Sequence, residues 1–114
     1  MGTIELTIDD TRSFQHVQYE FNERYPFLKI DFLRPSIGDR VQLFGRKGVR
    51  GTINIEKQRT VDQITKDFEA IFGMSMMVSR RSGNLWVGTS LTTDWTLERQ
   101  NGEGEIISRI GLQD

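Results

Sequence analysis

The sequence contains no cysteine and only one histidine in its 114 residues. The missing cysteines exclude disulfide frameworks, cysteine nucleophiles and zinc fingers, and a single histidine excludes any site that needs two histidine ligands. No apolar run approaches the roughly 20 residues that span a bilayer, and the N-terminal residues lack the basic and apolar regions of a signal peptide. These absences predict a cytoplasmic protein with no membrane partner, no metal and no cofactor.

Charge of one sign is also scarce, because 15 basic residues face 16 acidic ones and leave a net charge of −1. This balance excludes a general binder of polyanions. The charge is nevertheless uneven: residues 34–59 carry a net +5 and lie between residues 1–33 and 82–114, which carry −3 each. With 36% apolar and 27% charged residues, the chain can build one packed core, so we expect a single domain over residues 1–114.

Two segments, residues about 3–34 and 50–81, show the same order of strand, helix cap, amphipathic helix and strand. The predicted elements are a strand over Thr3–Ile8, a helix from Ser13 that ends at Pro26, a strand over Phe27–Leu33, a strand over Thr52–Glu56, a helix from Thr60 that ends at Gly73, and a strand over Met74–Arg80. Thr60 and Gln63 have the spacing of a capping box. Between the two segments we expect irregular chain or a small hairpin around Val41–Phe44.

The two segments match at a constant offset of 47 residues. The matched positions are Leu6 with Ile53, Ile8 with Ile55, Arg12 with Arg59, Ser13 with Thr60, Phe14 with Val61, Val17 with Ile64, Phe21 with Phe68, Tyr25 with Phe72, Pro26 with Gly73 and Arg34 with Arg81. One departure is visible, because the apolar positions Met74, Met76 and Val78 lie one residue off this register. We therefore expect a differently built helix–strand joint in the second segment, or a strand buried on both faces.

Tandem β-α-β units predict an α+β, ferredoxin-like fold. Because each helix has one apolar stripe, we expect both helices on one face of a mainly antiparallel sheet of five or six strands. The extension over residues 82–114 predicts a hairpin turn at Gly83, a strand over Leu85–Leu91 and a short helix over Trp95–Asn101, capped by Thr93 or Asp94 and ended by Gly102. The remaining tail is expected to be a last short strand or a frayed end.

Several short segments carry a family resemblance. They are Phe21-Asn22-Glu23, Tyr25-Pro26-Phe27-Leu28-Lys29, Thr60-Val61, Phe72-Gly73, Arg81-Ser82-Gly83-Asn84, Trp86-Val87, Asp94-Trp95-Thr96-Leu97-Glu98 and Gln100-Asn101. Together these segments resemble a family of small uncharacterised proteins of Bacteroidetes-type bacteria, over most of the chain except residues 35–51. The resemblance implies a small soluble bacterial protein with a single intracellular domain, and it brings no activity, ligand or site residue.

Candidate catalytic residues are few. His16 is expected on the solvent side of the first helix, and the sequence offers it no nucleophile. Asp94 and Glu98, four residues apart, would present two carboxylates on one helix face, but a helix cap and a first-turn acid are the favoured explanation of the two residues. The acids Asp9, Asp10 and Asp31 lack the spacing of a calcium loop. We therefore expect no enzyme.

The candidate binding residues are basic or aromatic. Arg46, Lys47 and Arg50 lie in a glycine-rich loop, residues 45–51, that would let the backbone approach an anion, although a solvated hairpin loop explains it too. Arg80, Arg81 and Trp86 lie near the sheet surface that the helices leave open. These residues predict a non-catalytic interaction or ligand-binding module, with a protein partner or self-association. The alternative is a nucleic-acid-binding domain that uses the basic loop and the open sheet face.

Overall fold

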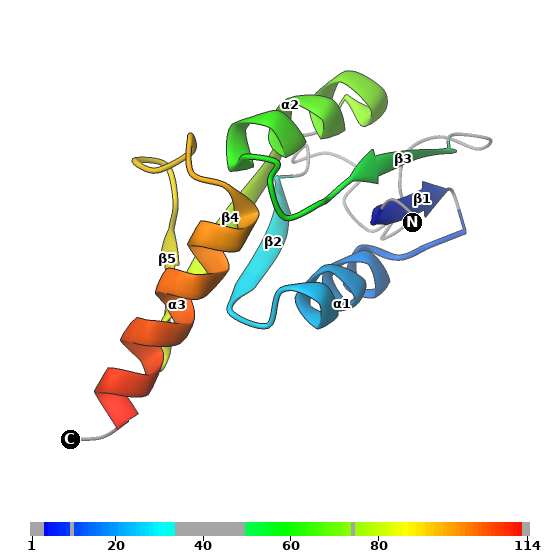
Figure 1. Ribbon diagram of the computed structural model, residues 1–114. Coiled ribbons are helices and arrows are strands. Elements are labelled where there is room, and N and C mark those ends of the chain that lie inside the picture. Colours follow the sequence, from blue (N-terminus) through cyan, green and yellow to red (C-terminus); the bar gives the residue numbers. More distant parts are fainter. Residues whose placement is uncertain (1–3, 10, 34–49, 74, 113–114) are drawn as a thin grey trace.

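The computed structural model describes residues 4–9, 11–33, 50–73 and 75–112, which form an α+β fold (Figure 1). Its elements are β1 (Glu5–Asp9), α1 (Phe14–Arg24), β2 (Leu28–Leu33), β3 (Arg50–Asn54), α2 (Val61–Phe72), β4 (Ser75–Ser82), β5 (Leu85–Gly88) and α3 (Leu97–Leu112). The order strand–helix–strand occurs twice and is followed by a hairpin strand and a helix. The order strand–helix–strand that the sequence predicts for both segments is confirmed, whereas the extension differs from its prediction in the length of its helix.

Both helix starts follow the sequence signals. The Ser13 side chain accepts a hydrogen bond from the His16 N–H at 3.1 Å, which caps α1. Thr60 Oγ1 accepts one from the Gln63 N–H at 3.1 Å, and the Gln63 side chain accepts one from the Thr60 N–H at 3.0 Å. The predicted capping box is therefore confirmed, and Gly73, in the left-handed region at φ 68°, ends α2 as expected.

The strands form two sheets, so the expected single sheet of five or six strands is wrong. Among the described residues, β1 pairs with β3, and β2, β4 and β5 form a second sheet in the order β2-β4-β5; every pairing is antiparallel. Each main helix packs against both strands of its own unit, α1 on β1 and β2 and α2 on β3 and β4. The helix thus separates its two strands into different sheets, and a ferredoxin-like arrangement is not confirmed.

The two units face each other across a pseudo-two-fold axis. In the first sheet Leu6 lies opposite Ile53, its match 47 residues later. In the second sheet Ile30 lies opposite Val78, 48 residues later. Equivalent residues therefore meet at the centre of both sheets, and the additional residue in the second unit accounts for the shift in strand phase that the sequence shows.

One hydrophobic core joins the units. Its buried members are Leu6, Ile8, Phe14, Val17, Phe21, Tyr25, Leu28, Ile30, Ile53, Ile55, Val61, Ile64, Phe68, Met76, Val78 and Leu97. The Phe32 ring lies between the two helices, 5.2 Å from the Phe14 centroid and 5.0 Å from the Phe68 centroid. Both apolar stripes therefore enter one core, although the single sheet that the two helices were expected to share is not present.

The two helix–strand joints differ, as the strand phase predicts. After α1, the Leu28 N–H donates to the Tyr25 carbonyl, and the Tyr25 hydroxyl donates to the Ile55 carbonyl in the other unit. After α2, Gly73 ends the helix in the left-handed region. In β4 both Val78 and Ser79 are buried, so at this point the strand is covered on both faces.

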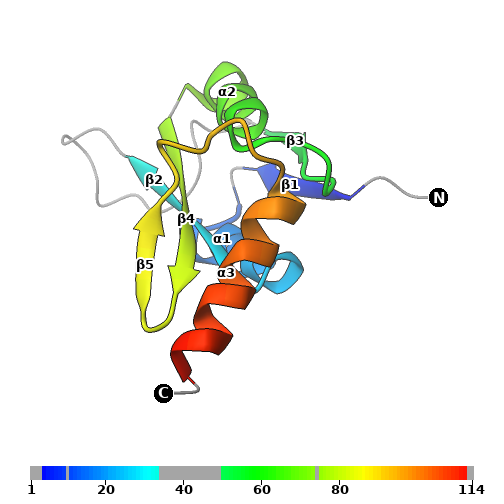
Figure 2. The same ribbon diagram turned by 60° about the vertical axis from the view of Figure 1, so that its left-hand side comes forward.

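Helix α3 is longer than the sequence predicts. Gly102 does not end it, the tail is helical rather than a strand or frayed end, and Thr96 rather than Thr93 or Asp94 caps it, because Thr96 Oγ1 accepts from the Arg99 N–H at 3.1 Å. The helix lies against β4 (Figure 2). Packing outweighs the low helix propensity of glycine here, because Gly104 lets α3 approach Phe27, where a Cβ would meet the Phe27 carbonyl oxygen at 3.2 Å.

Candidate interaction surface

The predicted basic loop is only partly visible. Arg46, Lys47 and the hairpin expected around Val41–Phe44 lie outside the described residues. Arg50 is the first residue of β3, where it is exposed and lies opposite Asp9 of β1. The structure therefore places one member of the loop, at the far end of the β1–β3 sheet.

Arg80 and Arg81 lie on opposite faces of β4, because neighbouring strand residues alternate. Arg80 lies under α3, where its Nη1 donates to Gln100 Oε1 at 2.8 Å and its guanidinium carbon is 5.4 Å from the Trp95 ring centroid. Arg81 lies on the face away from α3 and its Nε donates to the Gly83 carbonyl at 2.7 Å. The two arginines therefore cannot serve one site.

Trp86 lies opposite Arg81 and belongs to the same face. The Arg81 guanidinium carbon is 5.4 Å from the Trp86 ring centroid, and Lys29 Nζ is 5.3 Å from it. Lys29 was not among the predicted residues. The β2–β4 register identifies Lys29, because it places this residue opposite Ser79 of β4 and one strand away from Trp86.

The face that carries Trp86 is open at its β2 end and along Met77 over the described part of the chain, although Ser79 on the same face is buried. Leu33 at its β2 end is 53% exposed and Met77 of β4 is 44% exposed. The helices cover the other face, which carries Ile30 and Val78. The expected open sheet face is thus present, but its residues are mixed in charge, because Asp31 Oδ2 lies 3.7 Å from Lys29 Nζ.

The outer edge of β2 is covered by side-chain amides. Gln18 Nε2 of α1 donates to the Ile30 carbonyl at 2.9 Å, and Asn22 Nδ2 donates to the Leu28 carbonyl at 2.9 Å. Both carbonyls point away from β4, because the odd-numbered residues of β2 face it. Two side chains one helical turn apart thereby satisfy the edge of the strand.

Within the described residues, the outer edge of β4 is covered along only half its length. β5 pairs with Ser79–Ser82 and ends at Gly88; the Thr89 N–H and Oγ1 then both donate to the Val78 carbonyl, at 3.2 and 2.8 Å. The Arg81 N–H points to β2, where it donates to the Phe27 carbonyl, so the even-numbered residues of β4 point to the β5 side. The N–H and C=O of Met76 are therefore directed to an edge where no described strand lies.

A groove of about 320 Å³ lies beside this free edge. Its lining residues are Val61, Thr65, Met76, Met77, Val78, Gly88, Thr89, Ser90 and Thr93. Thr65 and Glu69 of α2 match Gln18 and Asn22 at the offset of 47, but the Thr65 hydroxyl donates to the Asp62 carbonyl within its own helix. The second unit thus lacks the amide that covers the strand edge in the first.

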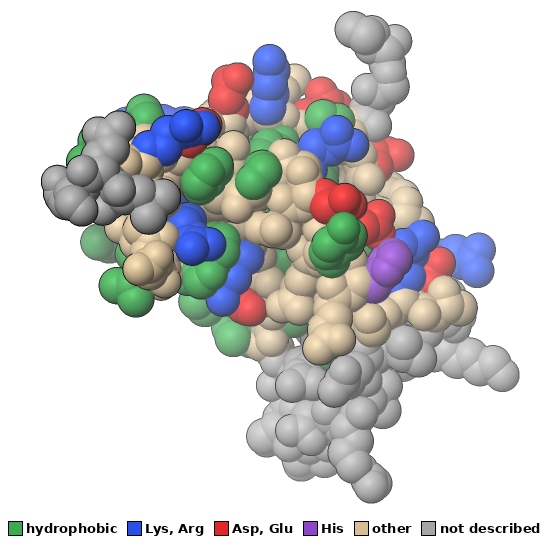
Figure 3. All heavy atoms as spheres, turned by 90° about the horizontal axis from the view of Figure 1, so that it is seen from below, with side chains coloured by type: hydrophobic (Ala, Val, Ile, Leu, Met, Phe, Trp, Pro, Cys, Tyr) green, Lys and Arg blue, Asp and Glu red, His purple; other side chains and the backbone are tan. Residues whose placement is uncertain are grey.

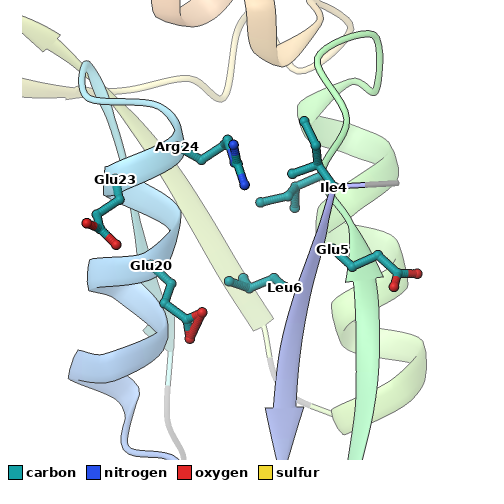
Figure 4. Close-up of a pocket in the computed structure, with 7 residues that line it drawn as sticks. Ile4, Glu5, Leu6, Glu20, Glu23 and Arg24 are labelled. Atoms are coloured by element: carbon teal, nitrogen blue, oxygen red, sulfur yellow. The ribbon is translucent and has the colours of Figure 1, made fainter. Parts of the chain in front are cut away.

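A second hollow, about 280 Å³, lies between α1 and β1 (Figure 4). Arg24 points across it toward Ile4, whereas Glu23 and Glu5 point away from it. The Glu20 carboxylate accepts from Arg12 Nη1 at 2.7 Å and lies 2.9 Å from His16 Nε2. His16 is exposed, as expected, and belongs to this surface cluster rather than to a nucleophile pair.

Asp10 lies outside the described residues, and the other candidate carboxylates do not gather into a metal site. Among residues 4–9, 11–33, 50–73 and 75–112, no three His, Cys, Asp or Glu side chains gather around one point. Asp94 precedes α3 and is exposed, and Glu98 Oε2 lies 3.8 Å from Lys57 Nζ. Hydrogen bonds from the Thr11 hydroxyl and N–H hold the pKa of Asp9 below its usual value.

Figure 3 shows basic, acidic and hydrophobic side chains interspersed on the face seen from below. No helix within the described residues has both the length and the apolar composition needed to cross a bilayer. Comparisons with protein-family models, with curated proteins and with solved structures gave no match. The candidate surface is therefore defined by geometry alone: the free edge of β4, its groove and the open face beside it.

Proposed function

We propose that this protein is a non-catalytic interaction module that binds an extended peptide segment of a protein partner along the free edge of β4. The observation that carries the proposal is the pairing of β5 with only the second half of β4, which leaves Met76 facing an apolar groove. An added strand would satisfy the Met76 N–H and C=O, and strand addition to a free edge is a common mode of peptide recognition.

The groove supports a preference for one apolar side chain. In an antiparallel pair, residues directly opposite each other place their side chains on the same face. The peptide residue opposite Met76 would therefore enter the groove beside Val61 and Thr65, and its neighbours would lie on the open face near Met77. Specificity would come from the side chains that enter the groove and lie on the open face, and affinity would come from the main-chain hydrogen bonds between the peptide and β4.

The first unit supplies the design of the test. In the double variant Thr65→Gln/Glu69→Asn, α2 carries the two amides with which α1 covers β2, so the added side chains would fill the groove and reach the edge of β4. The matched control is Ala70→Gln, an exposed position on α2 outside the groove.

The probe is a phage-displayed library of random peptides, selected on the natural chain and measured by titration. We expect apolar peptides that protect the Met76 amide from hydrogen exchange, and at least tenfold weaker binding to the double variant than to the Ala70→Gln control. A library without binders, or peptides that bind all three chains equally, would contradict the proposal.

Nucleic-acid binding is the second candidate, and Trp86 between Lys29 and Arg81 is the observation that favours it. An aromatic ring beside cations can stack on an unpaired base. Binding of a single-stranded RNA probe should then fall steeply with salt, and alanine at Arg46, Lys47 and Arg50 should flatten that dependence. Absence of binding at low salt would remove this candidate.

A further inference from the structure

The outer edge of β5 is also free of any described strand. β5 pairs with β4 alone and lies at the margin of the described structure (Figure 2). Because Arg80 of β4 points to β5, its partner Val87 points back to β4, and the residues on either side of Val87 point the other way. The N–H and C=O groups of Trp86 and Gly88 are therefore directed outward, along the free edge.

This edge has none of the features that usually protect a free strand edge. Charged side chains and proline discourage a second strand from pairing there. Residues 82–93 contain neither, although 27% of the chain is charged, and β5 is the only described strand without a charged residue. On the face that carries Arg80, Leu85 is 69% exposed and Val87 is 43% exposed. The β5 edge is therefore neutral and apolar, as an edge that pairs with another strand would be.

Gly88 has no explanation within its own chain. The described glycines with positive φ are Gly73 and Gly83, so the backbone at Gly88 does not require glycine. A Cβ on Gly88 would meet no described atom within 4 Å. Glycine inside a strand weakens it, because it loses more conformational freedom than any other residue and has no side chain to pack. A side chain of another molecule that occupies the space over Gly88 would give the glycine a role.

The β5 edge is complementary to itself in one register. In an antiparallel pair of β5 strands centred on Val87, Trp86 of each copy lies opposite Gly88 of the other, so the outward N–H and C=O groups of both strands bond to each other. Residues that lie opposite each other place their side chains on the same face. The Trp86 ring of one copy therefore lies over Gly88 of the other, and an aromatic residue across from a glycine stabilises an edge strand.

Other arrangements of the two strands fit less well. A shift of two residues would put Trp86 opposite Trp86 and Gly88 opposite Asn84, which lies in the hairpin turn. In the register centred on Val87, like charges stay apart. Lys29 and Arg81 lie on β2 and β4, so both β5 strands separate them from their counterparts.

We infer that β5 pairs antiparallel with β5 of a second copy of this chain, about a two-fold axis at Val87. The two three-stranded sheets then form one continuous sheet, and Val87 faces its own counterpart, as in closed two-fold dimers. The inference uses the edge of β5 and not that of β4, so it does not rest on the proposed function.

Mass in solution tests the dimer directly. Light scattering of the natural chain over a concentration series should rise from 13.2 kDa toward twice that value. Val87→Lys puts two like charges opposite each other at the axis and should hold the mass at 13.2 kDa. Ile71→Lys is the matched control, because Ile71 of α2 is also 43% exposed and lies away from β5 (Figure 1), so this variant should associate normally.

Gly88→Val tests the role of the glycine without weakening the fold. Valine suits a strand better than glycine does, so the variant should be no less stable than the natural chain in urea. Its side chain would occupy the space that the second copy's Trp86 ring needs, so association should weaken at least tenfold. Unchanged association of this variant would contradict the pairing of Trp86 with Gly88.

The absence of cysteine makes the register testable by oxidation. The Cα atoms of the two Val87 residues would lie about 4.5 Å apart, within the range of a disulfide. Val87→Cys should therefore form a covalent dimer quickly. Leu85→Cys is more exposed but would lie opposite Thr89 of the second copy, so it should cross-link slowly. A constant monomer mass, a dimer that persists in Val87→Lys, or equally fast cross-linking at both positions would overturn the inference.

Discussion

The outer edges of β2 and β4 are equivalent positions in the two units, but they differ in how much of the edge is covered. On β2, Gln18 and Asn22 of α1 donate to two carbonyls that would otherwise face solvent. On β4, the matched positions are Thr65 and Glu69, neither of which covers the strand, and a short β5 covers half of it. The comparison teaches that an open edge in this molecule follows from two side chains rather than from a different fold.

The features that the units share are those that set their architecture. Arg12 binds Glu20 at 2.7 Å, and Arg59 binds Asp67, the matched pair, at 2.7 Å. The turn before each helix is closed by the same bond, from the Arg12 N–H to the Asp9 carbonyl and from the Arg59 N–H to the Glu56 carbonyl. Repeated turn, cap and ion pair hold the helices alike, so the differences lie at the edges.

The largest expected effect breaks the shared core at matched positions. Phe21→Ala and Phe68→Ala each remove a fully buried ring and should each lower the free energy of unfolding by about 3 to 5 kcal/mol. Urea denaturation measures both losses. A large loss at Phe21 with a small one at Phe68 would mean that the two helices do not share a core.

The second prediction tests the edge difference itself. Gln18→Ala and Asn22→Ala each leave a β2 carbonyl without its donor and should each cost about 1 kcal/mol. Thr65→Ala removes a hydroxyl bonded within its own helix and should cost clearly less. The same denaturation series measures all three, and an equal cost at Thr65 would abolish the distinction between the edges.

The third prediction concerns the joints. Burial raises the pKa of Tyr25 to about 12, and its match, Phe72, has no proton to lose. Because the folded chain keeps the Tyr25 proton above pH 10 while the unfolded chain loses it, stability should be complete below pH 10 and fall from there toward pH 12. Tyr25→Phe should reduce this fall by about 2 kcal/mol at pH 12.

The measurement is the pH dependence of the unfolding midpoint in the natural chain and in the Tyr25→Phe variant. Lysines titrate in both chains, so their contribution cancels in the difference between the two curves. The Tyr25→Phe variant should also be less stable at neutral pH, since the Ile55 carbonyl loses its donor. Parallel pH curves for the two chains would show that Tyr25 does not cause the loss.

The smallest expected effect is local to the first turn. The Thr11 hydroxyl is the main reason for the lowered pKa of Asp9, so Thr11→Ala should raise that pKa toward its usual value. Carboxyl chemical shifts followed by NMR against pH measure the change. The remaining Thr11 N–H bond should leave part of the shift in place, and an unchanged pKa would assign the whole effect to the backbone.

The sequence predicts the parts of this fold that local patterns determine. These parts are the helix caps, the apolar stripes and the turn at Gly73. Each depends only on residues that are close together in the sequence and can therefore be predicted from it. The pairing of strands is not predictable in this way. The alternation of apolar residues along a strand indicates which face is buried, but it does not indicate which strand lies beside it. Gly102 wrongly predicts a helix end, because the packing that keeps α3 helical depends on the contact of Gly104 with Phe27, which is far away in the sequence.

The candidate surface was predictable to a smaller extent. Trp86 and Arg81 share a face as neighbours across a tight hairpin, which residue spacing alone can reveal. The position of Lys29 beside Trp86 and the free edge at Met76 follow from the β2–β4 register, which the sequence does not predict. Adjacency in the sequence suggests that Arg80 and Arg81 belong together, although the alternation of side chains along a strand puts them on opposite faces.

Within the described residues, neither unit pairs a strand with another strand of its own: β1 finds its partner in β3, and β2 in β4. During synthesis, the first unit therefore emerges from the ribosome before the strands that pair with β1 and β2. Every described sheet pair of that unit must wait for residues that follow 41 to 52 positions later. Folding should accordingly be a single late event, slow for so small a chain, in which both units become ordered together.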